Sequence, residues 1–333
     1  MVLGIEDIKR VTQGASKVIY EDGRFKFFRF SDEELKSTDS ASLRSAAGIQ
    51  LEFRTDGKIL KLNVNTSQTL KIRSYFSFDI FIDGQPAGYI KNFNDEDCIG
   101  DYANKVYKTG DFYGEFELGK GEKTVKIVFP HSLAADITDI EITDATFILP
   151  VKKEKILVAY GDSITQGYDA LHPSNAYIRR MADYLNAELI NKSLGGAKFL
   201  TNLAAVPNDI DADYIFVAYG TNDWNASDKS TLTANAESFF AEIEKNYPDT
   251  TVIVITPIWR YDYNDIKMAG SFSELTTVIT EISNKYKNTF VIPGVDLIPH
   301  SEDLFGDLIL HPNDKGFEYY YENLLCSIKK LLG

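Results

Sequence analysis

The sequence predicts a chain of two parts, a jelly-roll-like antiparallel β-sandwich over residues 1–150 and an α/β part over residues 151–333. Three observations predict this division. Apolar residues alternate with period two through the first part, turn signals interrupt that alternation at short intervals, and apolar strand runs alternate with amphipathic helical segments after Pro150. The chain of 333 residues is also longer than one core usually fills. We therefore expect a three-layer α/β/α domain with a five-stranded parallel sheet, preceded by the sandwich.

The strand pattern of the first part is clearest at residues 60–65, where leucine and valine alternate with lysine and asparagine. Such alternation places apolar side chains on one face of a strand and polar side chains on the other. Asp56-Gly57 stands between IQLEFRT and KILKLNV, and Asp83-Gly84 follows FDIFI. Because two-residue hairpins favour Asp-Gly, we expect a hairpin turn at both places. About eight short strands without a long helix are typical of a sandwich.

Five apolar runs of the second part are the expected strands of the parallel sheet. They lie at residues 156–160, 188–190, 214–218, 252–256 and 289–292. Amphipathic helical segments between them would cover both faces of such a sheet. Ser174 is expected to cap a helix that carries Tyr177, and Asn313 is expected to cap the last helix.

The charge composition argues against nucleic acid and membrane partners. With 49 acidic and 35 basic side chains, the net charge of -14 repels a phosphate backbone and an anionic membrane surface. No apolar stretch approaches the roughly 20 residues that a bilayer requires, and the opening MVLGIEDIKRVTQ lacks the pattern of a secretory signal. These features predict a soluble, cytoplasmic protein, with a secreted protein whose signal has been removed as the alternative. No feature of the sequence predicts its oligomeric state.

The two cysteines, Cys98 and Cys326, lie in different halves of the chain and have no CxxC spacing. They suggest buried free thiols rather than a disulfide framework or a zinc site. The sequence also has no metal-ligand spacing and no dinucleotide-binding glycine pattern, so we expect neither a metal nor another cofactor.

Polar motifs follow several of the predicted strands. They are GDSITQG at residues 161–167, NKSLGG at 191–196, GTND at 220–223, and Asp307 with His311-Pro312-Asn313 after the last strand. Ligands of open parallel sheets bind beyond the carboxyl ends of the strands, so these motifs are the expected site. A lone GDS is common in turns, because glycine, aspartate and serine are all turn residues. The four motifs together are hard to reproduce as loop composition.

This arrangement resembles the four sequence blocks of the SGNH (GDSL-like) hydrolase family over roughly residues 155–333. The resemblance implies Ser163 as nucleophile and His311 as base. It also implies an oxyanion hole made by the backbone N–H groups of Ser163 and Gly196 and the side-chain amide of Asn222. Acyl transfer needs this set of groups, a nucleophile, a base and donors for the developing negative charge. We expect glycine at position 196 because a Cβ atom would obstruct the approach of the substrate.

The assignments of the base and of the acid each have an alternative. His172 lies only nine residues after Ser163 and is the nearest rival to His311 as base. Asp307 stands four residues before His311, whereas the family commonly places its acid three residues before the histidine. Either a one-residue bulge leaves Asp307 as the acid, or Ser163 and His311 act as a dyad.

A β-sandwich followed by an SGNH domain resembles carbohydrate esterases that deacetylate plant polysaccharides. The resemblance implies a serine esterase that removes short acyl groups, acetyl above all, from a small-molecule or oligosaccharide ester. Alternatives are a lipase or acylhydrolase, an acyltransferase to another alcohol, and an inactive carbohydrate-binding relative. Trp224 and Trp259 follow the third and fourth strands, where they could stack on a sugar or simply pack at an interface.

Overall fold

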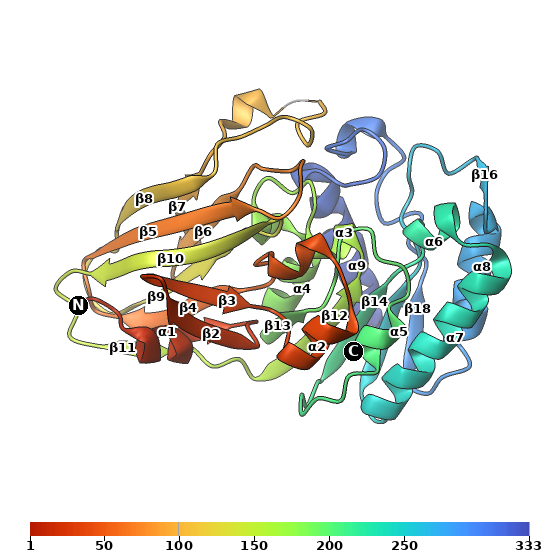
Figure 1. The fold of residues 1–333 in the computed structure, drawn as a ribbon, viewed down its shortest axis with the longest axis horizontal. Coiled ribbons are helices and arrows are strands. Elements are labelled where there is room, and N and C mark those ends of the chain that lie inside the picture. The colour runs from red at the N-terminus through yellow and green to blue at the C-terminus, as the bar shows by residue number, and fades with distance from the viewer. Residues whose placement is uncertain (99, 333) are drawn as a thin grey trace.

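The computed structural model describes residues 1–98 and 100–332. In this part of the chain, the N-terminal strands form two antiparallel sheets and the later strands form a parallel sheet (Figure 1). The predicted fold class, a sandwich followed by an α/β part, is therefore confirmed. A two-stranded sheet of β16 (Ile266–Lys267) and β17 (Gly270–Ser271) is added to the α/β part.

The sandwich consists of two sheets that face each other. The first has the order β1 (Thr12–Gln13), β4 (Gln50–Thr55), β9 (Lys123–Val128), β6 (Ser77–Ile82) and β7 (Gln85–Lys91), with β11 (Ile148–Pro150) also paired to β4. The second has the order β2 (Lys17–Glu21), β3 (Arg24–Phe28), β10 (Leu133–Ile142), β5 (Ile59–Gln68) and β8 (Gly110–Glu117). The short helices of this part are α1 (Ile5–Val11), α2 (Asp32–Ser37), η1 (Ala41–Arg44) and η2 (Asp95–Asp97).

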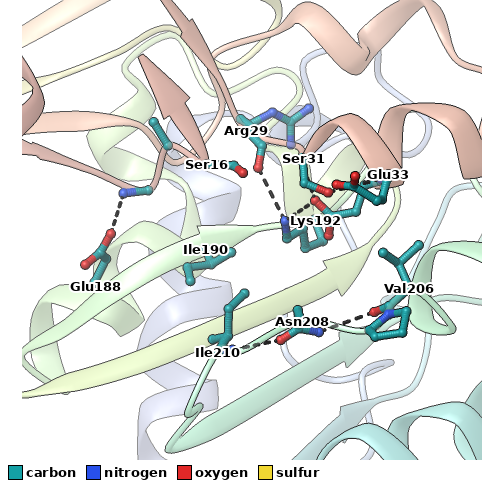
Figure 2. A pocket seen from close by; sticks show the side chains of 14 residues that line it. Ser16, Arg29, Ser31, Glu33, Glu188, Ile190, Lys192, Val206, Asn208 and Ile210 are labelled. Carbon is teal, nitrogen blue, oxygen red and sulfur yellow. Dashed lines mark hydrogen bonds and ion pairs between the residues drawn. The ribbon is translucent and has the colours of Figure 1, made fainter.

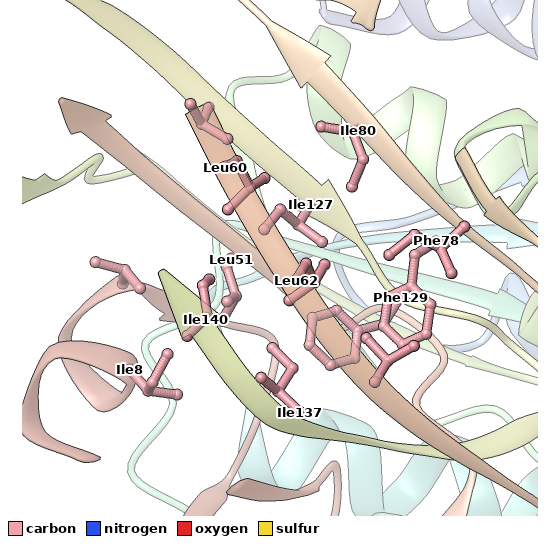
Figure 3. Packing of buried hydrophobic residues seen from close by; sticks show 14 of the residues in the cluster. Ile8, Leu51, Leu60, Leu62, Phe78, Ile80, Ile127, Phe129, Ile137 and Ile140 are labelled. Atoms are coloured by element: carbon pink, nitrogen blue, oxygen red, sulfur yellow. The ribbon is translucent and has the colours of Figure 1, made fainter. Parts of the chain in front are cut away.

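The apolar core of the sandwich lies between its sheets. Leu60 and Leu62 of β5 are fully buried, and they face Phe78 and Ile127 of the opposite sheet (Figure 3). Alternate residues of β5 are buried and half-buried, as period-two alternation predicts. Burying such side chains stabilises the fold by about 1.5–3 kcal/mol each.

One of the two expected hairpins is present and the other is not. Asp83 and Gly84 join β6 to β7 as a two-residue turn, with φ of 49° and 77°, as a type I′ turn requires. Asp56-Gly57 instead leads from β4 into β5, and these strands belong to different sheets. The hairpin prediction there was wrong, because an Asp-Gly signal fixes a local turn but not the partner of the next strand.

The parallel sheet has the order β13 (Ala187–Asn191), β12 (Lys155–Gly161), β14 (Tyr214–Ala218), β15 (Thr251–Ile255) and β18 (Thr289–Ile292). Each of the five strands coincides with its predicted run to within one residue at both ends. Helices α4 (Tyr177–Tyr184) and α9 (Asp314–Leu332) pack on one face. Helices α5 (Thr201–Ala204), α7 (Lys229–Asn246) and α8 (Phe272–Ser283) pack on the other (Figure 1). The remaining helices are α3 (Ser163–Gln166), η3 (Pro173–Asn175), α6 (Thr221–Ala226) and η4 (Glu302–Leu304).

The two predicted helix caps have different outcomes. Asn313 precedes α9, and its side-chain oxygen accepts a hydrogen bond from the backbone N–H of Gly316 at 3.0 Å, which confirms the cap. Ser174 does not cap α4, which begins after Ala176 without a side-chain cap. The hydroxyl of Ser174 donates to Asp79 of the sandwich at 2.6 Å, so a contact between the two parts outweighs the local signal.

The two parts meet along the edge strand β13. The buried guanidinium of Arg29 donates to the carbonyl oxygens of Asn191 and Ser193, and Lys192 forms a buried ion pair of 2.6 Å with Glu34. Figure 2 shows this junction, where residues of both parts line a cavity of about 330 Å³. These contacts hold the NKSLGG motif against the sandwich.

Cys98 and Cys326 are not joined in a disulfide, and only Cys98 is buried. Cys326 is exposed on α9, so the expectation of a buried thiol was wrong there. Within residues 1–98 and 100–332, no helix combines the length and apolar character that crossing a membrane requires.

Candidate active site

Ser163 is the first residue of α3, directly after the carboxyl end of β12. Asp162 caps this short helix by accepting a hydrogen bond from the backbone N–H of Ile164 at 2.9 Å. Burial raises the pKa of the Asp162 carboxyl to about 6. The helix ends at Gly167, which has a φ of 106° that disfavours any residue with a Cβ atom. The strand-to-helix turn thus fixes the direction of the Ser163 side chain.

His311 lies against Ser163, with its Nε2 atom 2.7 Å from the serine Oγ. The other three histidines are held elsewhere. His131 is buried against the carbonyl of Ala170, His172 contacts Asp79, and His300 contacts the carbonyl of Val295. The structure therefore brings His311, and not the rival His172, to the serine.

Asp307 contacts the far side of the His311 ring, with its Oδ2 atom 2.5 Å from Nδ1. Its Oδ1 atom accepts hydrogen bonds from the backbone N–H groups of Ile309, Leu310 and His311 at 2.8–3.0 Å. Leu308 has a φ of 61°, so the extra residue of the spacing is accommodated by a left-handed turn. The structure thus shows the bulged arrangement, in which Asp307 reaches the base.

The electrostatic surroundings keep Asp307 ionised. Burial by itself would raise the pKa of this carboxyl, but the hydrogen bond and charge of His311 and the backbone donors lower the pKa well below its ordinary value. An ionised Asp307 accepts the Nδ1–H of His311, and this leaves Nε2 free to accept a proton from Ser163.

Two further residues at this site were not found by sequence reasoning. Arg73, from the loop between β5 and β6 of the sandwich, approaches His311 Nδ1 to 3.1 Å and Asp307 Oδ2 to 3.7 Å. The same guanidinium pairs with Asp169, from the loop after α3, through Nε at 2.8 Å and Nη2 at 3.3 Å. No local motif marks either residue, since the pair joins positions 96 residues apart.

Three side chains of this cluster are of types that bind metals. One ligand atom each of Asp169, Asp307 and His311 lies within 4.8 Å of the others. Arg73, a cation, stands among them and approaches both carboxylates. The guanidinium would repel a dication at this position, so the residues do not fit a metal centre.

The expected oxyanion-hole residues lie on loops beside the serine. The loop that carries Gly196 is fixed by hydrogen bonds from Leu194 N–H to the Gly161 carbonyl and from Gly195 N–H to the Gln166 side chain. Gly196 is exposed, and no acceptor for its N–H lies within the described part of the chain. Asn222 Nδ2 donates to the Ala197 carbonyl of the same loop at 2.9 Å, which leaves its second amide hydrogen available.

The backbone gives another reason for glycine at position 196, in addition to the expected approach of the substrate. A Cβ atom there would meet no protein atom within 4 Å, so crowding by the protein does not require glycine. The residue instead has a φ of +76°, a left-handed conformation that strains residues with a side chain.

Of the two alternatives for Trp224 and Trp259, the structure supports packing and not stacking on a sugar. Trp224 is 0% exposed, and its indole nitrogen donates to the Gly270 carbonyl. Trp259 is 5% exposed and stacks on His300 with ring centroids 5.2 Å apart. Both residues pack in the interior, and neither offers an open ring face to a sugar.

A known family matches the part of the chain that carries these residues. A sequence profile of the GDSL-like lipase/acylhydrolase family matches residues 159–319, a range that contains Ser163, Gly196, Asn222, Asp307 and His311. No curated protein sequence matches the chain significantly.

Solved structures similar to the chain share its two-part fold at low sequence identity. The chain is similar to the salicylyl-acyltransferase SsfX3 from a tetracycline biosynthetic pathway, with a TM-score of 0.81, 18% identity and coverage of 96% of this chain and 94% of that one. It is similar to a putative GDSL-like lipase from Bacteroides ovatus, with a TM-score of 0.77, 20% identity and coverage of 100% and 98%. It is also similar to an acetyl xylan esterase from the rumen bacterium Butyrivibrio proteoclasticus, with a TM-score of 0.61, 16% identity and coverage of 100% and 98%. Residues 159–319 of the chain thus match the GDSL-like lipase/acylhydrolase family, and the whole chain has the fold of these two-part proteins.

Proposed function

We propose that this protein is a serine esterase that removes short acyl groups, acetyl above all, from hydroxylated carbohydrate substrates. The observation that carries the proposal is the continuous chain of contacts from Asp307 Oδ2 to His311 Nδ1 at 2.5 Å and from His311 Nε2 to Ser163 Oγ at 2.7 Å. A nucleophile, a base and an orienting acid in this order are the parts of a serine hydrolase.

The proposed reaction has two steps, and the first forms an acyl-enzyme. His311 Nε2 takes the proton of the Ser163 hydroxyl while Oγ attacks the ester carbonyl carbon. The carbonyl oxygen becomes negatively charged in the tetrahedral intermediate, where the N–H groups of Ser163 and Gly196 and the amide of Asn222 would stabilise it. When the intermediate collapses, the bond to the sugar oxygen breaks and His311 gives that oxygen its proton.

The second step frees the enzyme by the same route in reverse. A water molecule loses a proton to His311 and attacks the acyl carbon on Ser163. The ester bond to Oγ breaks, the serine recovers the proton from His311, and the carboxylic acid leaves. Asp307 remains ionised throughout and stabilises the imidazolium that forms in each step.

The substrate class rests on the similar acetyl xylan esterase and on charge. That protein shares the fold over the whole chain, and its substrate, as its name gives it, is an acetylated polysaccharide. The net charge of -14 disfavours anionic lipid surfaces and nucleic acids as partners and is compatible with an uncharged sugar ester.

A second candidate function is acyl transfer to an alcohol other than water. The similarity to a salicylyl-acyltransferase, at a TM-score of 0.81, favours it as the alternative. The same three residues would form the acyl-enzyme, and the difference would lie only in whether water or an alcohol takes the acyl group.

A hydrolysis panel tests the proposal. Acetyl, butyryl and octanoyl esters of 4-nitrophenol and acetylated xylo-oligosaccharides would be compared with and without an added alcohol, using the Ser163→Ala protein as the control. We expect acetyl esters to be the best substrates and the released acyl group to appear as free acid. Octanoyl turnover without acetyl turnover would contradict the acetylesterase proposal, and transfer to the alcohol in preference to water would favour the alternative.

A further inference from the structure

We infer that Arg73 is a positioning residue of the active site, supplied by the β-sandwich and held by Asp169 so that its positive charge lies beside the Asp307–His311 contact. The inference deepens the proposed function and rests on it for the role of His311. It assigns to the sandwich a part in the chemistry itself, in addition to any part in substrate binding.

The position of Arg73 follows from its contacts. The loop between β5 and β6 extends from the sandwich toward the α/β part (Figure 1). Arg73 is 7% exposed, and its Nη2 atom lies 3.1 Å from His311 Nδ1 and 3.7 Å from Asp307 Oδ2. Since Nδ1–H donates to Asp307, the approach of the guanidinium to the imidazole ring is an electrostatic contact and not a hydrogen bond.

Asp169 fixes this guanidinium from the opposite side. The carboxylate is fully buried and receives Arg73 through two nitrogens, the geometry that an arginine fork favours. The Tyr75 hydroxyl also donates to Asp169 Oδ1 at 3.0 Å, and the Tyr102 hydroxyl donates to the Asp169 carbonyl. Both tyrosines come from the sandwich, so the sandwich holds both members of the pair.

Arg73 and Asp169 both have an unusual backbone conformation. Arg73 has a φ of 59° and Asp169 a φ of 69°, in the left-handed region that residues with side chains rarely adopt. Such conformations persist where the surrounding structure enforces them, and they are concentrated at functional sites. Here the enforced conformations bring a guanidinium and a carboxylate together beside the base.

The charges around His311 indicate what the Arg73–Asp169 pair does. Asp307 and Asp169 contribute two negative charges and Arg73 one positive charge, so the resting cluster carries a net charge of one negative unit with a neutral His311. When His311 takes the proton of Ser163, the cluster becomes neutral. Without Arg73, two carboxylates would face the ring and favour its protonation at rest, when it must be a neutral base.

Asp169 is needed for a different reason. Burial raises the pKa of this carboxyl, while His311 and Arg73 act in the opposite direction, and the two-nitrogen contact identifies the pair as ionised. Without Asp169, the guanidinium would have only Asp307 to pair with, 3.7 Å away. It would then compete with His311 for the carboxylate oxygen that orients the ring.

The groups that face His311 from every element around it are few. They are Asp307 on its own loop, Asp162 and Ser163 at the end of β12, Tyr168 and Asp169 after α3, and Arg73 from the sandwich. Among these, Arg73 is the only permanent cation. Its removal therefore changes the local charge in a way that no other member of the cluster can offset.

The test is an NMR titration of the histidine ring nitrogens in the full-length protein. Labelling with ¹⁵N-histidine gives the ring signals of four histidines to assign, and His311→Gln identifies those at the active site. We expect Asp169→Asn to lower the titration midpoint of His311 by roughly one pH unit, because a nearby negative charge is lost. We expect Arg73→Gln to raise that midpoint. Shifts in opposite directions distinguish a charge effect from loosened packing.

A matched control comes from another ion pair between the two parts. Lys126 of β9 pairs with Asp183 of α4 at 2.9 Å, and neither residue is among the groups that face His311. Lys126→Gln should leave the midpoint of His311 unchanged. If Asp169→Asn and Arg73→Gln also leave it unchanged, or shift it in the same direction, the inference is wrong.

Arg73→Lys keeps the test decisive if the neutral variants do not fold. Lysine preserves the charge but cannot form the two-nitrogen contact with Asp169. We expect its titration midpoint to stay near that of the wild type while kcat falls by about tenfold or more at unchanged KM, as misplacement of a catalytic group produces. Wild-type kcat in this variant would overturn the positioning role. A wild-type protein without esterase activity would instead refute the proposed function, and the NMR midpoints would still decide the inference.

Discussion

At two places in the part of the chain that the structure describes, a serine, a histidine and one aspartate are linked by direct contacts. These are Ser163, His311 and Asp307 at the candidate active site, and Ser174, His172 and Asp79 where the sandwich meets the α/β part. At the active site the serine hydroxyl contacts the histidine, and the histidine contacts the aspartate. At the second place the hydroxyl donates directly to the aspartate at 2.6 Å, and the histidine contacts another oxygen of the same carboxylate at 3.0 Å.

The difference shows that the order of contacts, and not the set of residue types, makes a catalytic unit. A base that does not contact the hydroxyl cannot take its proton. Asp79 belongs to the sandwich, and His172 and Ser174 belong to the α/β part, so the second set joins the two parts of the chain. We therefore assign it a structural role.

The largest effect is expected from the serine and the histidine of the active site. Ser163→Ala and His311→Ala should each reduce kcat for an acetyl ester by on the order of a millionfold, as individual members of such a unit do in a serine hydrolase. Ser174→Ala and His172→Ala are the matched variants of the second set, and they should change kcat by only a few-fold. An inactive His172→Ala protein together with an active His311→Ala protein would reverse our assignment of the base.

The next largest effect concerns Asp307. Asp307→Asn should reduce kcat by up to about ten-thousandfold at neutral pH, because an amide at this position can select the wrong tautomer of the imidazole. Asp303 is exposed on the same segment, and Asp303→Asn serves as the control. A loss below roughly tenfold for Asp307→Asn would mean that Ser163 and His311 act as a dyad, despite the 2.5 Å contact.

A smaller effect is expected at the oxyanion hole. Asn222→Ala should lower kcat by roughly a hundred- to a thousandfold with little change in KM, because an oxyanion donor acts mainly in the transition state. Asn225→Ala, an exposed asparagine on the same helix, is the control. An effect confined to KM would assign Asn222 to substrate binding in the ground state.

The smallest predicted effect is on stability and distinguishes the second set from the first. Burial by itself lowers the pKa of His172, but the hydrogen bond and charge of Asp79 outweigh it and raise the pKa above 6.5. Because the pKa is higher in the folded state, the contact of protonated His172 with Asp79 stabilises the fold. This stabilisation is complete below the unfolded-state pKa and is lost as the pH rises through the folded-state pKa.

His172→Gln should therefore lower Tm more at about pH 5.5 than at about pH 8.5. The difference should be a few degrees, since 1 kcal/mol shifts Tm by about 2–4 °C in domains of 150–250 residues. Thermal unfolding followed by circular dichroism measures both values. Equal losses of Tm at the two pH values would show that the charge of His172 does not stabilise the fold.

Local patterns were sufficient to predict much of the α/β part. Its strands are continuous apolar runs, and each motif follows the end of a strand, so sequence order alone places Ser163 and His311 at the same edge of the sheet. For the sandwich, the sequence predicted the fold class but not which strands pair. Asp56-Gly57 marks a turn, but whether the next strand joins the same sheet depends on contacts distant in sequence.

Side-chain partners that lie far apart in the sequence could not be predicted. Serine is a favoured residue at a helix N-cap, yet the hydroxyl of Ser174 donates to Asp79, which lies 95 residues earlier. Arg73 and Asp169 carry no motif, and only the packing of the loop between β5 and β6 brings them to His311. Trp224 follows a motif that predicts a rim position, but its large apolar ring is buried in the core.

The central claim is that Ser163 is the nucleophile and that His311 activates it. Incubation with a fluorophosphonate, followed by peptide mass spectrometry, tests it directly, because such reagents modify activated serines covalently. We predict a single adduct on the peptide that contains Ser163, its loss in His311→Ala, and its retention in His172→Ala. An adduct on Ser174, or an adduct on Ser163 that persists without His311, would show that these roles are wrongly assigned.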